Sequence, residues 1–509
     1  MRIPRLRLRP RLRLPAVLLL VPLLAGCFVA APGDPYGDAD GTGSGGGARL
    51  RVALAFPPAE NYSPYGMDAY DLSRLGVVEG LTRLDANGTA VAALAESWYA
   101  EGNGRDWLFS LREATFHDGT EVTAAAVADS LTRAALAEPP PGALSGIRLT
   151  AEAAGDRLVR VSTEEPDPVL PLRLSNPSLA VFAPSAFTGD RVNPAGTATG
   201  PFVLTTTTGD TAASLDRFDG YWGGRAHASG VDVRYISDGT ARANALRTGE
   251  VDVAEAVPVA QVPALDPDTV HEINTARNTS LYLNTSTGLF TDPGLRAAAR
   301  EAIDTAAVAD GVYEGYAEPA QGLYGPALSW AAGLRGEPTG RTADPAAPDG
   351  AALTLATYND RPELPETAQV VQQQLEHAGF TVRLEVRGYA QLESDLLAGA
   401  FDAAVLSRNM MLETGDPVTV LASGYTCEGS FNPALLCDPA VDALTEAARA
   451  EAGPAQRQQA AIRAEAAVLG TDAEIPLVHL KVVTGIRPGV TGVVLDPYER
   501  ELVGAGTRR

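Results

Sequence analysis

The sharpest alternation of apolar and polar positions in this chain of 509 residues lies between residues 196 and 256, which predict strand, strand, strand, helix and strand in that order. Apolar side chains alternate with polar ones over residues 231–235, as in a half-buried strand. Asp238 can cap the following helix and Gly249 can end it, before residues 251–253 resume the strand pattern. The order of elements indicates a sheet covered by helices.

The part of the chain before this region has the same mixture of elements. The sequence LRVALAF at residues 50–56 alternates like a strand, and so do residues 107–111. Asn-Gly at residues 87–88 marks a hairpin turn between two short strands. Thr123 can cap a helix over residues 124–133, which has one apolar face.

The region after residue 350 predicts a repeated strand–helix unit. Strands are expected at residues 354–358, 380–386 and 402–406, with helices at 366–377 and 392–397 between them. Such a βαβαβ order predicts parallel strands with crossover helices. Ligands of these sheets lie beyond the carboxyl ends of the strands, so the loops that follow the strands are the first place to look for a site.

Four more elements are expected at the end of the chain. Helices should start at Pro439 and near Pro454, because proline is favoured in the first turn of a helix. Residues 479–484 and 490–495 then alternate as two strands.

The first 27 residues have the anatomy of an export signal. Six arginines precede residue 14, and an apolar run over residues 14–24 is too short to stay in a bilayer as a spanning helix. The sequence Leu-Ala-Gly-Cys that ends at Cys27 resembles a bacterial lipobox, whose cysteine carries lipid and becomes the mature N-terminus. A plain signal peptide with an incidental cysteine is the alternative. The Gly-, Asp- and Ser-rich residues that follow Cys27 predict a flexible tether.

Length and charge narrow the class of protein. A chain of this length is expected to form two or three domains, and 45% hydrophobic with 20% charged residues is ordinary for a globular protein. The net charge is −23, and it becomes −29 if the six arginines of the signal are removed. Such acidity disfavours binding to nucleic acid or to an anionic membrane surface.

Nothing in the sequence indicates catalysis, a metal centre or a cofactor. The five histidines are scattered singly, and the three cysteines form no CxxC pair. No GxSxG, HExxH, Walker or GxGxxG motif occurs. His117 lies in an FHDG turn, where a structural role is favoured. We therefore expect no enzyme, although a secreted lipoprotein hydrolase built from the scattered histidines is the weakest alternative.

Three stretches of residues 196–256 read GTATGPF, FDGYWGG and ALRTGEVDVA. They resemble the central signature of extracellular solute-binding protein family 5, which holds dipeptide-, oligopeptide- and nickel-binding receptors of ABC importers. Residues 76–134 resemble the N-terminal signature of the same family, and AID at 302–304 ends a third family segment. The resemblance, over nearly all of residues 49–500, implies an α/β, two-lobed periplasmic-binding-protein-like fold (class II, cluster C type) with mixed sheets flanked by helices.

The same resemblance implies three domains behind a signal and a tether. The expected limits are 1–26 for the signal peptide, 27–48 for the lipid-anchored tether, 49–75, 190–272 and 485–509 for domain I, 76–189 for domain II, and 273–484 for domain III.

Two charged residues are the main ligand-binding candidates. In dipeptide-binding members of the family, an arginine in an RP-containing loop pairs with the ligand carboxylate, and Arg361 matches it. An aspartate four residues before the proline of a DP turn pairs with the ligand ammonium, and Glu413 takes that position. A guanidinium grips a carboxylate with two hydrogen bonds, and an acid balances a desolvated ammonium. Glutamate in place of aspartate is a departure that would shift the ammonium or shorten the permitted ligand.

Further candidates come from the neighbouring strand end and loop. Arg408 would be a second anion partner, Asn409 would lie beside it, and Met410 would offer an adaptable apolar wall. As plain core residues, Met410 and Met411 would point one inward and one outward. Asp416 is a candidate that could equally cap or shape its Asp-Pro turn.

The resemblance also implies a disulfide between Cys427 and Cys437. Dipeptide-binding relatives carry a bridged pair just after the same turn, and an exported protein meets an oxidising space. The bridge would stiffen the loop that bears Asn432, a further ligand-binding candidate.

These expectations combine into an extracytoplasmic lipoprotein of an ABC transporter. It would be a monomer that closes over a small solute, most simply a short peptide, and hands it to the permease. The lipid on Cys27 would hold it at the outer face of the cell membrane. A receptor for nickel or a metallophore is the alternative within the family.

Overall fold

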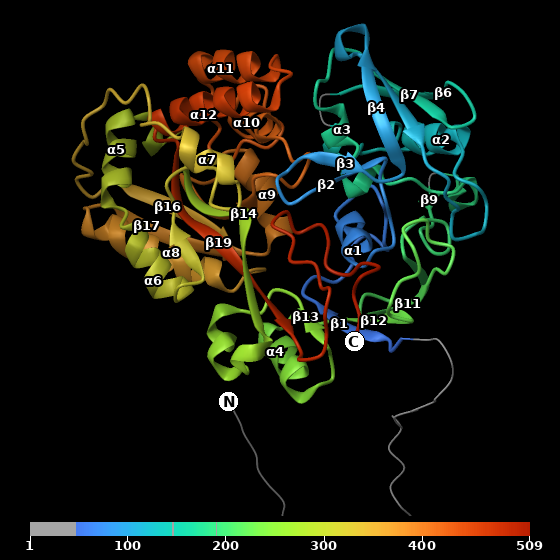
Figure 1. Cartoon of the computed structure of the whole chain (residues 1–509). Helices are drawn as coiled ribbons and strands as arrows, with labels where there is room; N and C mark the ends of the chain where they lie inside the picture. Colours follow the sequence, from blue (N-terminus) through green and yellow to red (C-terminus); the bar gives the residue numbers. More distant parts are fainter. Residues whose placement is uncertain (1–46, 145–146, 190) are drawn as a thin grey trace, which may run out of the picture. The chain divides into compact units, whose positions relative to one another are not determined.

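The computed structural model of the protein describes residues 47–144, 147–189 and 191–509 (Figure 1). The expected signal peptide (1–26), Cys27 and the tether up to residue 46 lie outside the described residues. Among the residues that the structure describes, no helix combines the length and the apolar character that crossing a bilayer requires.

One mixed sheet of eleven strands connects the early, middle and late parts of the described chain. β1 pairs in parallel with β12 and β13, and β13 pairs antiparallel with β19. β19 pairs antiparallel with β14, and β14 pairs antiparallel with β18. β16 lies parallel to both β18 and β17, which confirms the predicted βαβαβ unit. In spatial order the strands are β10 (Phe202–Thr208), β11 (Ala212–Arg217), β12 (Gly230–Tyr235), β1 (Leu50–Leu54), β13 (Val253–Ala254), β19 (Glu474–Ile486), β14 (Val270–Leu283), β18 (Ala403–Asn409), β16 (Ala352–Tyr358) and β17 (Thr381–Arg387), with β15 (Ala317–Pro319) beside β19.

Helices cover this sheet where the apolar periodicity predicted them. The Asp238 carboxylate accepts a hydrogen bond from the Ala241 amide at 2.6 Å and starts α4, while Gly249 ends it with φ of 79°. α8 packs on β16, β17 and β18, and α10, α11 and α12 lie together as neighbours (Figure 1). The helices of the described chain are α1 (Asp68–Arg74), α2 (Ala124–Ala135), α3 (Leu170–Arg173), α4 (Gly239–Thr248), α5 (Pro293–Ala302), α6 (Thr305–Tyr313), α7 (Ser329–Leu334), α8 (Glu363–His377), α9 (Tyr389–Leu397), α10 (Pro417–Tyr425), α11 (Pro439–Arg449) and α12 (Pro454–Gly470).

The described strands between residues 82 and 192 form three smaller sheets. Asn-Gly at residues 87–88 connects the predicted hairpin, and the Thr123 hydroxyl caps α2 by accepting from the Ala126 amide. His117 is a turn residue, as expected, with Nε2 2.9 Å from the carbonyl oxygen of Gly200. Burial lowers the pKa of His117 to about 4. The strands are β2 (Thr82–Leu84) with β3 (Ala90–Ala92), then β4 (Ala95–Glu101), β5 (Asp106–Leu111), β7 (Leu158–Thr163) and β6 (Leu149–Ala153) in spatial order, and β8 (Phe187–Thr188) with β9 (Arg191–Val192).

The main sheet and the smaller sheets pack on separate hydrophobic clusters. One contains side chains of β14, β16 and β18, another those of β1, β10 and β12, and a third those of β5, β7 and α2. The expected limits of domains I and III, after residues 272 and 484, fall inside β14 and β19. Because these two strands continue from one hydrophobic cluster toward the next, they mark no boundary at these residues. The domain limits therefore stay a prediction.

Two expectations were wrong. Residues 490–495 form no strand, and only Thr491 makes a bridge, to Arg508. Gly492 interrupts the extended backbone with φ of 72°, at a place where a Cβ atom would lie 2.3 Å from the carbonyl oxygen of Gly506. Met410 and Met411 do not alternate between core and surface, since both are buried in the β14–β18 cluster.

A disulfide joins Cys427 to Cys437, as the resemblance implied. Asn432 organises the loop between them, because its Nδ2 donates to the carbonyl oxygens of Thr426 (3.1 Å) and Leu436 (2.7 Å) and its Oδ1 accepts from the Leu436 amide (3.0 Å). All these partners lie within the loop or at its edge.

Replacing Cys427 and Cys437 together by serine should lower the free energy of unfolding by about 2–3 kcal/mol, because a closed loop of this length restricts the unfolded chain. Urea unfolding followed by tryptophan fluorescence measures the loss. Thiol titration of the unfolded, unreduced protein lacking Cys27 should find no reactive thiol, and two thiols per chain would contradict the bridge.

Candidate ligand-binding site

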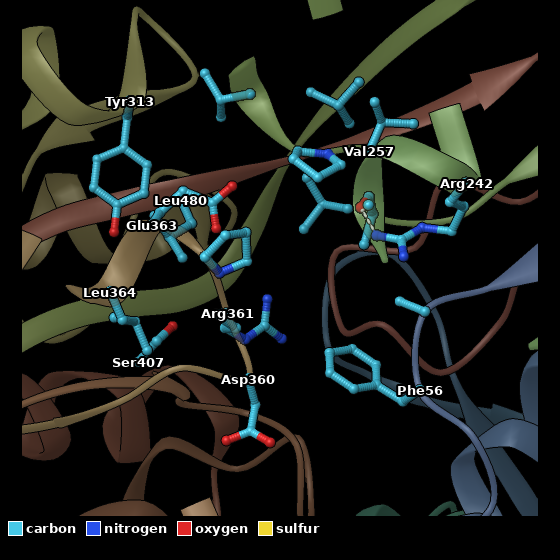
Figure 2. A pocket seen from close by; sticks show the side chains of 18 of the residues that line it. Phe56, Arg242, Val257, Tyr313, Asp360, Arg361, Glu363, Leu364, Ser407 and Leu480 are labelled. Carbon is cyan, nitrogen blue, oxygen red and sulfur yellow. Dashed lines mark hydrogen bonds between the residues drawn. The ribbon is translucent and has the colours of Figure 1, made fainter. Parts of the chain in front are cut away.

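A cavity of about 270 Å³ lies where several parallel strands of the main sheet end. Its walls come from the residues that follow β1, β12 and β13 on one side and β16 on the other, and residues 480–483 of β19 lie between them. This is the position that the strand-end rule favours for a ligand. Figure 2 shows side chains from both sides facing a common space.

Arg361, predicted from the sequence, lines this cavity. Its guanidinium extends from the loop after β16 into the open space, with Phe56 and Arg242 on the opposite side (Figure 2). The nearest charged partner is Glu499, at 3.9 Å from Nη2 to Oε2, and the Phe56 ring centroid lies 5.6 Å from Cζ. Within the described chain, no acceptor forms a hydrogen bond with this guanidinium. Burial lowers the pKa of Arg361 and neighbouring Arg277 lowers it further, against the opposing effect of Glu499.

Three acids line the same cavity, and they differ in what they already bind. The Asp238 carboxylate caps α4, and Asp360 Oδ2 accepts from the Tyr389 amide at 2.8 Å, with its side chain directed away from Arg361 (Figure 2). Glu363 opens α8, and its carboxylate forms neither a hydrogen bond nor an ion pair within the described residues. The cavity therefore holds one acid that is not committed to the fold. Its place two residues after Arg361, at the start of a helix that follows a strand, is the signal that could have identified it.

The opposite wall combines a saturated arginine with apolar side chains. Arg242 donates to the carbonyl oxygens of Glu255 (Nε, 2.7 Å), Ile236 (Nη1, 2.6 Å) and Ala256 (Nη2), so its charge is present but its donors are used. Phe56 is 37% exposed and stands at the end of β1. The sequence did not predict Phe56 and Arg242 as cavity residues, because the alternating pattern of a strand does not show which side chain beyond the strand end faces a cavity.

Glu413 lies outside this cavity, in the loop between β18 and α10. Desolvation of its carboxyl by neighbouring protein atoms raises its pKa, with Arg500 and Arg408 opposing the rise. A Cβ atom on Gly142 would lie 2.9 Å from Glu413 Oε2, which places the carboxylate against the smaller domain. The main-chain oxygen of Glu413 accepts a hydrogen bond from Asn176 Nδ2. The structure thus brings Arg361 and Glu413 to loops at the same sheet edge, but not to the same cavity.

The other candidates at the end of β18 face the interior. Burial alone would lower the pKa of Arg408, but Tyr282, Tyr425 and Glu474 raise it, and the guanidinium lies 4.6 Å over the Phe431 ring. Asn409 Nδ2 donates to the carbonyl oxygen of Tyr498 at 3.2 Å and to Glu499 Oε1 at 3.3 Å. Met410 is a core residue. None of the three lines the cavity, and neither does Asn432.

Asp416 is committed to the fold. It caps α10 through Oδ2, which accepts from the Thr419 amide at 3.1 Å. Both carboxylate oxygens also bind Arg457, at 2.6 Å to Nε and 2.7 Å to Nη2. The two side chains are 1% and 7% exposed, so this is a buried bidentate ion pair between α10 and α12.

The part of the chain that the structure describes contains no cluster of three or more histidine, cysteine, aspartate or glutamate side chains that could hold a metal ion. The cavity presents the guanidinium groups of Arg361 and Arg242, the Lys481 side chain, an uncommitted carboxylate, main-chain groups and apolar walls. Such a lining can orient a charged solute by its ends but offers no activated nucleophile beside a base.

A comparison with protein families matches residues 89–432 to the bacterial extracellular solute-binding proteins, family 5 middle. The glutathione-binding protein GsiB of Escherichia coli (strain K12) is 25% identical over 455 residues, which cover 82% of this chain and 86% of GsiB.

Solved structures show the same fold. NikA of Staphylococcus aureus, in complex with Ni(L-His)2, superposes with a TM-score of 0.77 at 21% identity, over 91% of this chain and 100% of NikA. A dipeptide-binding protein of Pseudoalteromonas sp. SM9913, in complex with Met-Leu, superposes with a TM-score of 0.76 at 18% identity, over 90% of this chain and 99% of that protein. The predicted mixed α/β binding-protein fold is confirmed.

Changing Asp416 to asparagine should cost about 3–5 kcal/mol of unfolding free energy, because it keeps a capping oxygen but leaves the Arg457 charge buried without its partner. Asp438→Asn is the matched control, since Asp438 caps α11 in the same Asp-Pro pattern and forms no ion pair with the residues that the structure describes. Urea unfolding compares the two variants. A ligand affinity that falls in Asp416→Asn while stability is kept would instead favour direct ligand contact.

Proposed function

The chain belongs to family 5 of the bacterial extracellular solute-binding proteins, and from this membership we propose that its cargo is a short peptide with free ends. As a member of the family it is the solute receptor of an ABC importer, it acts outside the cytoplasm, and it binds without catalysing a reaction. Receptors of this class capture a solute and deliver it to the permease of the importer, and we propose the same for this protein.

The observation that carries the proposal is the state of Arg361. A guanidinium that lies in protein surroundings, lines a cavity and has no hydrogen-bond acceptor within the described chain has unused donors for a ligand. A carboxylate satisfies them best, because its two oxygens match the planar fork. In dipeptide-binding members of the family, an arginine in an RP-containing loop at this position has the same role.

The ammonium end has two candidate partners. Glu413 matches the family position but stands outside the cavity that contains Arg361. Glu363 lines the cavity, and its carboxylate has no other partner in the described residues. A dipeptide held at Arg361 would use Glu363 if it stays in this cavity, and a longer peptide would reach toward Glu413.

Arg361→Ala should weaken binding of a free peptide by about 2–5 kcal/mol, because the ligand carboxylate would be desolvated without its partner. Arg361→Lys keeps the charge but loses the two-pronged contact, so its loss should be smaller. Isothermal titration calorimetry with the peptide, and with its N-acetylated and C-amidated form, measures these effects. Glu363→Gln and Glu413→Gln then show which acid receives the ammonium. Equal affinity of wild type for free and capped peptide would refute the charge clamp.

A chelated metal is the second candidate cargo, favoured by the likeness in fold to NikA with Ni(L-His)2. The residues lining the cavity include no histidine, so a metal would have to arrive with its own ligands, whose carboxylates Arg361 could bind. Native mass spectrometry of the purified protein, looking for a retained ligand, separates the two, because nickel has a distinctive isotope pattern.

We also propose that Cys27 carries the lipid that tethers the receptor to the outer face of the membrane. Its support is the order of an apolar run, small residues and cysteine at the end of the signal. The receptor would then be held there as a monomer, close to the permease that it serves.

A palmitate analogue fed to cells should label the wild-type protein, and Cys27→Ala should abolish labelling and release the protein from membrane fractions. The unrelated change of Cys427 and Cys437 to serine is the control and should leave labelling intact. Equal labelling of Cys27→Ala would show that the anchor lies elsewhere.

A further inference from the structure

The segment after β19 crosses between two hydrophobic clusters and presents one acid beside the cavity. Tyr498 packs in the β14–β18 cluster, and Leu502 packs with β1. The Asp496 carboxylate accepts amide hydrogen bonds from Tyr498 (3.0 Å) and Arg500 (2.6 Å) and thus builds a tight turn. Glu499 lies in this turn with φ of 59°, a backbone region that non-glycine residues avoid unless the surroundings impose it. The turn therefore fixes the backbone from which the Glu499 side chain extends.

Glu499 forms a bidentate ion pair with Arg277. Its Oε1 accepts from Arg277 Nε at 3.0 Å and its Oε2 from Nη2 at 3.1 Å. The side chains are only 12% and 11% exposed. Arg277 can reach Glu499 because the pairing of β14 with β19 is interrupted between Asn274 and Asn278, and such irregularities redirect a side chain.

Arg361 lies next to this ion pair, but it contacts Glu499 more weakly than Arg277 does. The 3.9 Å separation from Glu499 is too long for a hydrogen bond, whereas both oxygens of Glu499 are occupied by Arg277. Burial alone would raise the pKa of Glu499, but Arg277 and Arg361, with Arg74, lower it to about 2. Arg74 Nε donates to the main-chain oxygen of Glu499 at 2.9 Å, while the Arg74 charge pairs with Asp71 (3.1 Å) and Glu255 (3.3 Å).

Two guanidinium groups and one carboxylate thus meet behind the cavity wall, with one positive charge left over on Arg361, the member of the three that lines the cavity. We propose that Glu499 determines the charge specificity of the site, by neutralising Arg277 so that the Arg361 end accepts a ligand group with a single negative charge. The inference rests on the proposed function and deepens it. The substrate class becomes peptides whose carboxyl end carries one negative charge, as opposed to those with an additional acid at that end.

An isosteric pair of peptides, alanyl-glutamine and alanyl-glutamate, tests this proposal by calorimetry at neutral pH. Wild type should prefer alanyl-glutamine by about tenfold or more, a difference of about 1.4 kcal/mol. Glu499→Gln frees the charge of Arg277, so the preference should disappear or reverse. The double variant Arg277→Met/Glu499→Gln removes both partners, leaves Arg361 as the single charge, and should restore the preference for alanyl-glutamine.

The control is Glu250→Gln, which removes one carboxylate of the same charge but leaves the Arg277–Glu499 pair intact. Glu250 pairs with Arg234 at 2.6 Å, both side chains are more than half exposed, and neither residue lines the cavity. Glu250→Gln should keep the wild-type ratio of affinities. A Glu499→Gln variant that weakens both peptides equally, or a double variant that stays shifted, would show that Glu499 only supports the fold and would overturn the proposal.

A second pair of probes separates this inference from the proposed function. Propionate and malonate are similar in size and differ by one carboxylate, and protection against thermal unfolding reports their binding. If wild type binds neither peptide, the peptide proposal fails.

The role of Glu499 is then still tested by the two anions. Wild type should be protected more by propionate than by malonate, and Glu499→Gln should be protected more by malonate than by propionate. An unchanged order in that variant would contradict the role of Glu499. If Glu499→Gln does not fold, Arg277→Met is the alternative variant, because it leaves the Glu499 charge to neutralise Arg361. Both anions should then protect less than in wild type, and unchanged protection by either anion would overturn the role of Glu499.

Discussion

Backbone pairing between β14 and β19 is the constraint on which the geometry of the site depends. These strands pair along most of their length, and each carries one half of the sheet on its other side, β13 beside β19 and β18 beside β14. The cavity is lined from both halves, with Arg242 on one side and Arg361 on the other. The separation of these two guanidinium groups is therefore set by the bend and twist of two strands. A hinge motion located in such a pair changes the cavity without unpacking either hydrophobic cluster.

Electrostatics at the cavity follows from the same two strands. The break in their register puts Arg277 beside the turn that holds Glu499, and this buried pair leaves Arg361 with an unmatched charge. A charge that is costly to hold in protein surroundings is compensated when an anion arrives. The binding role proposed for Arg361 thus rests on a fold that satisfies the neighbouring Arg277 and leaves Arg361 without a hydrogen-bond acceptor in the described residues.

The sequence predicted local elements well where periodicity and capping residues agreed. Asp238, Gly249 and Thr123 mark helix ends that the structure confirms, and the βαβαβ unit was visible from alternating apolar runs. It could not show that all these strands belong to one sheet, because β13 and β19 pair across more than two hundred residues. Arg361 was found by the strand-end rule and by resemblance. Arg408 interacts with the charge of the buried Glu474, which no periodic pattern in the sequence indicates. Glu363 and Glu499 sit in a helix start and a turn, where neighbouring residues in sequence do not indicate what a side chain faces.

The order of strands in the main sheet also has a consequence in time. Leu50 of the first strand pairs with Val231, and Val253 pairs with Ile486 of the last strand. The sheet cannot be completed until nearly the whole chain is available, and contacts so distant in sequence slow folding. For an exported receptor this delay is useful, since a chain that has not yet closed its sheet stays threadable during secretion. The long-range pairing that joins the two sides of the cavity thus also favours a native state that forms late.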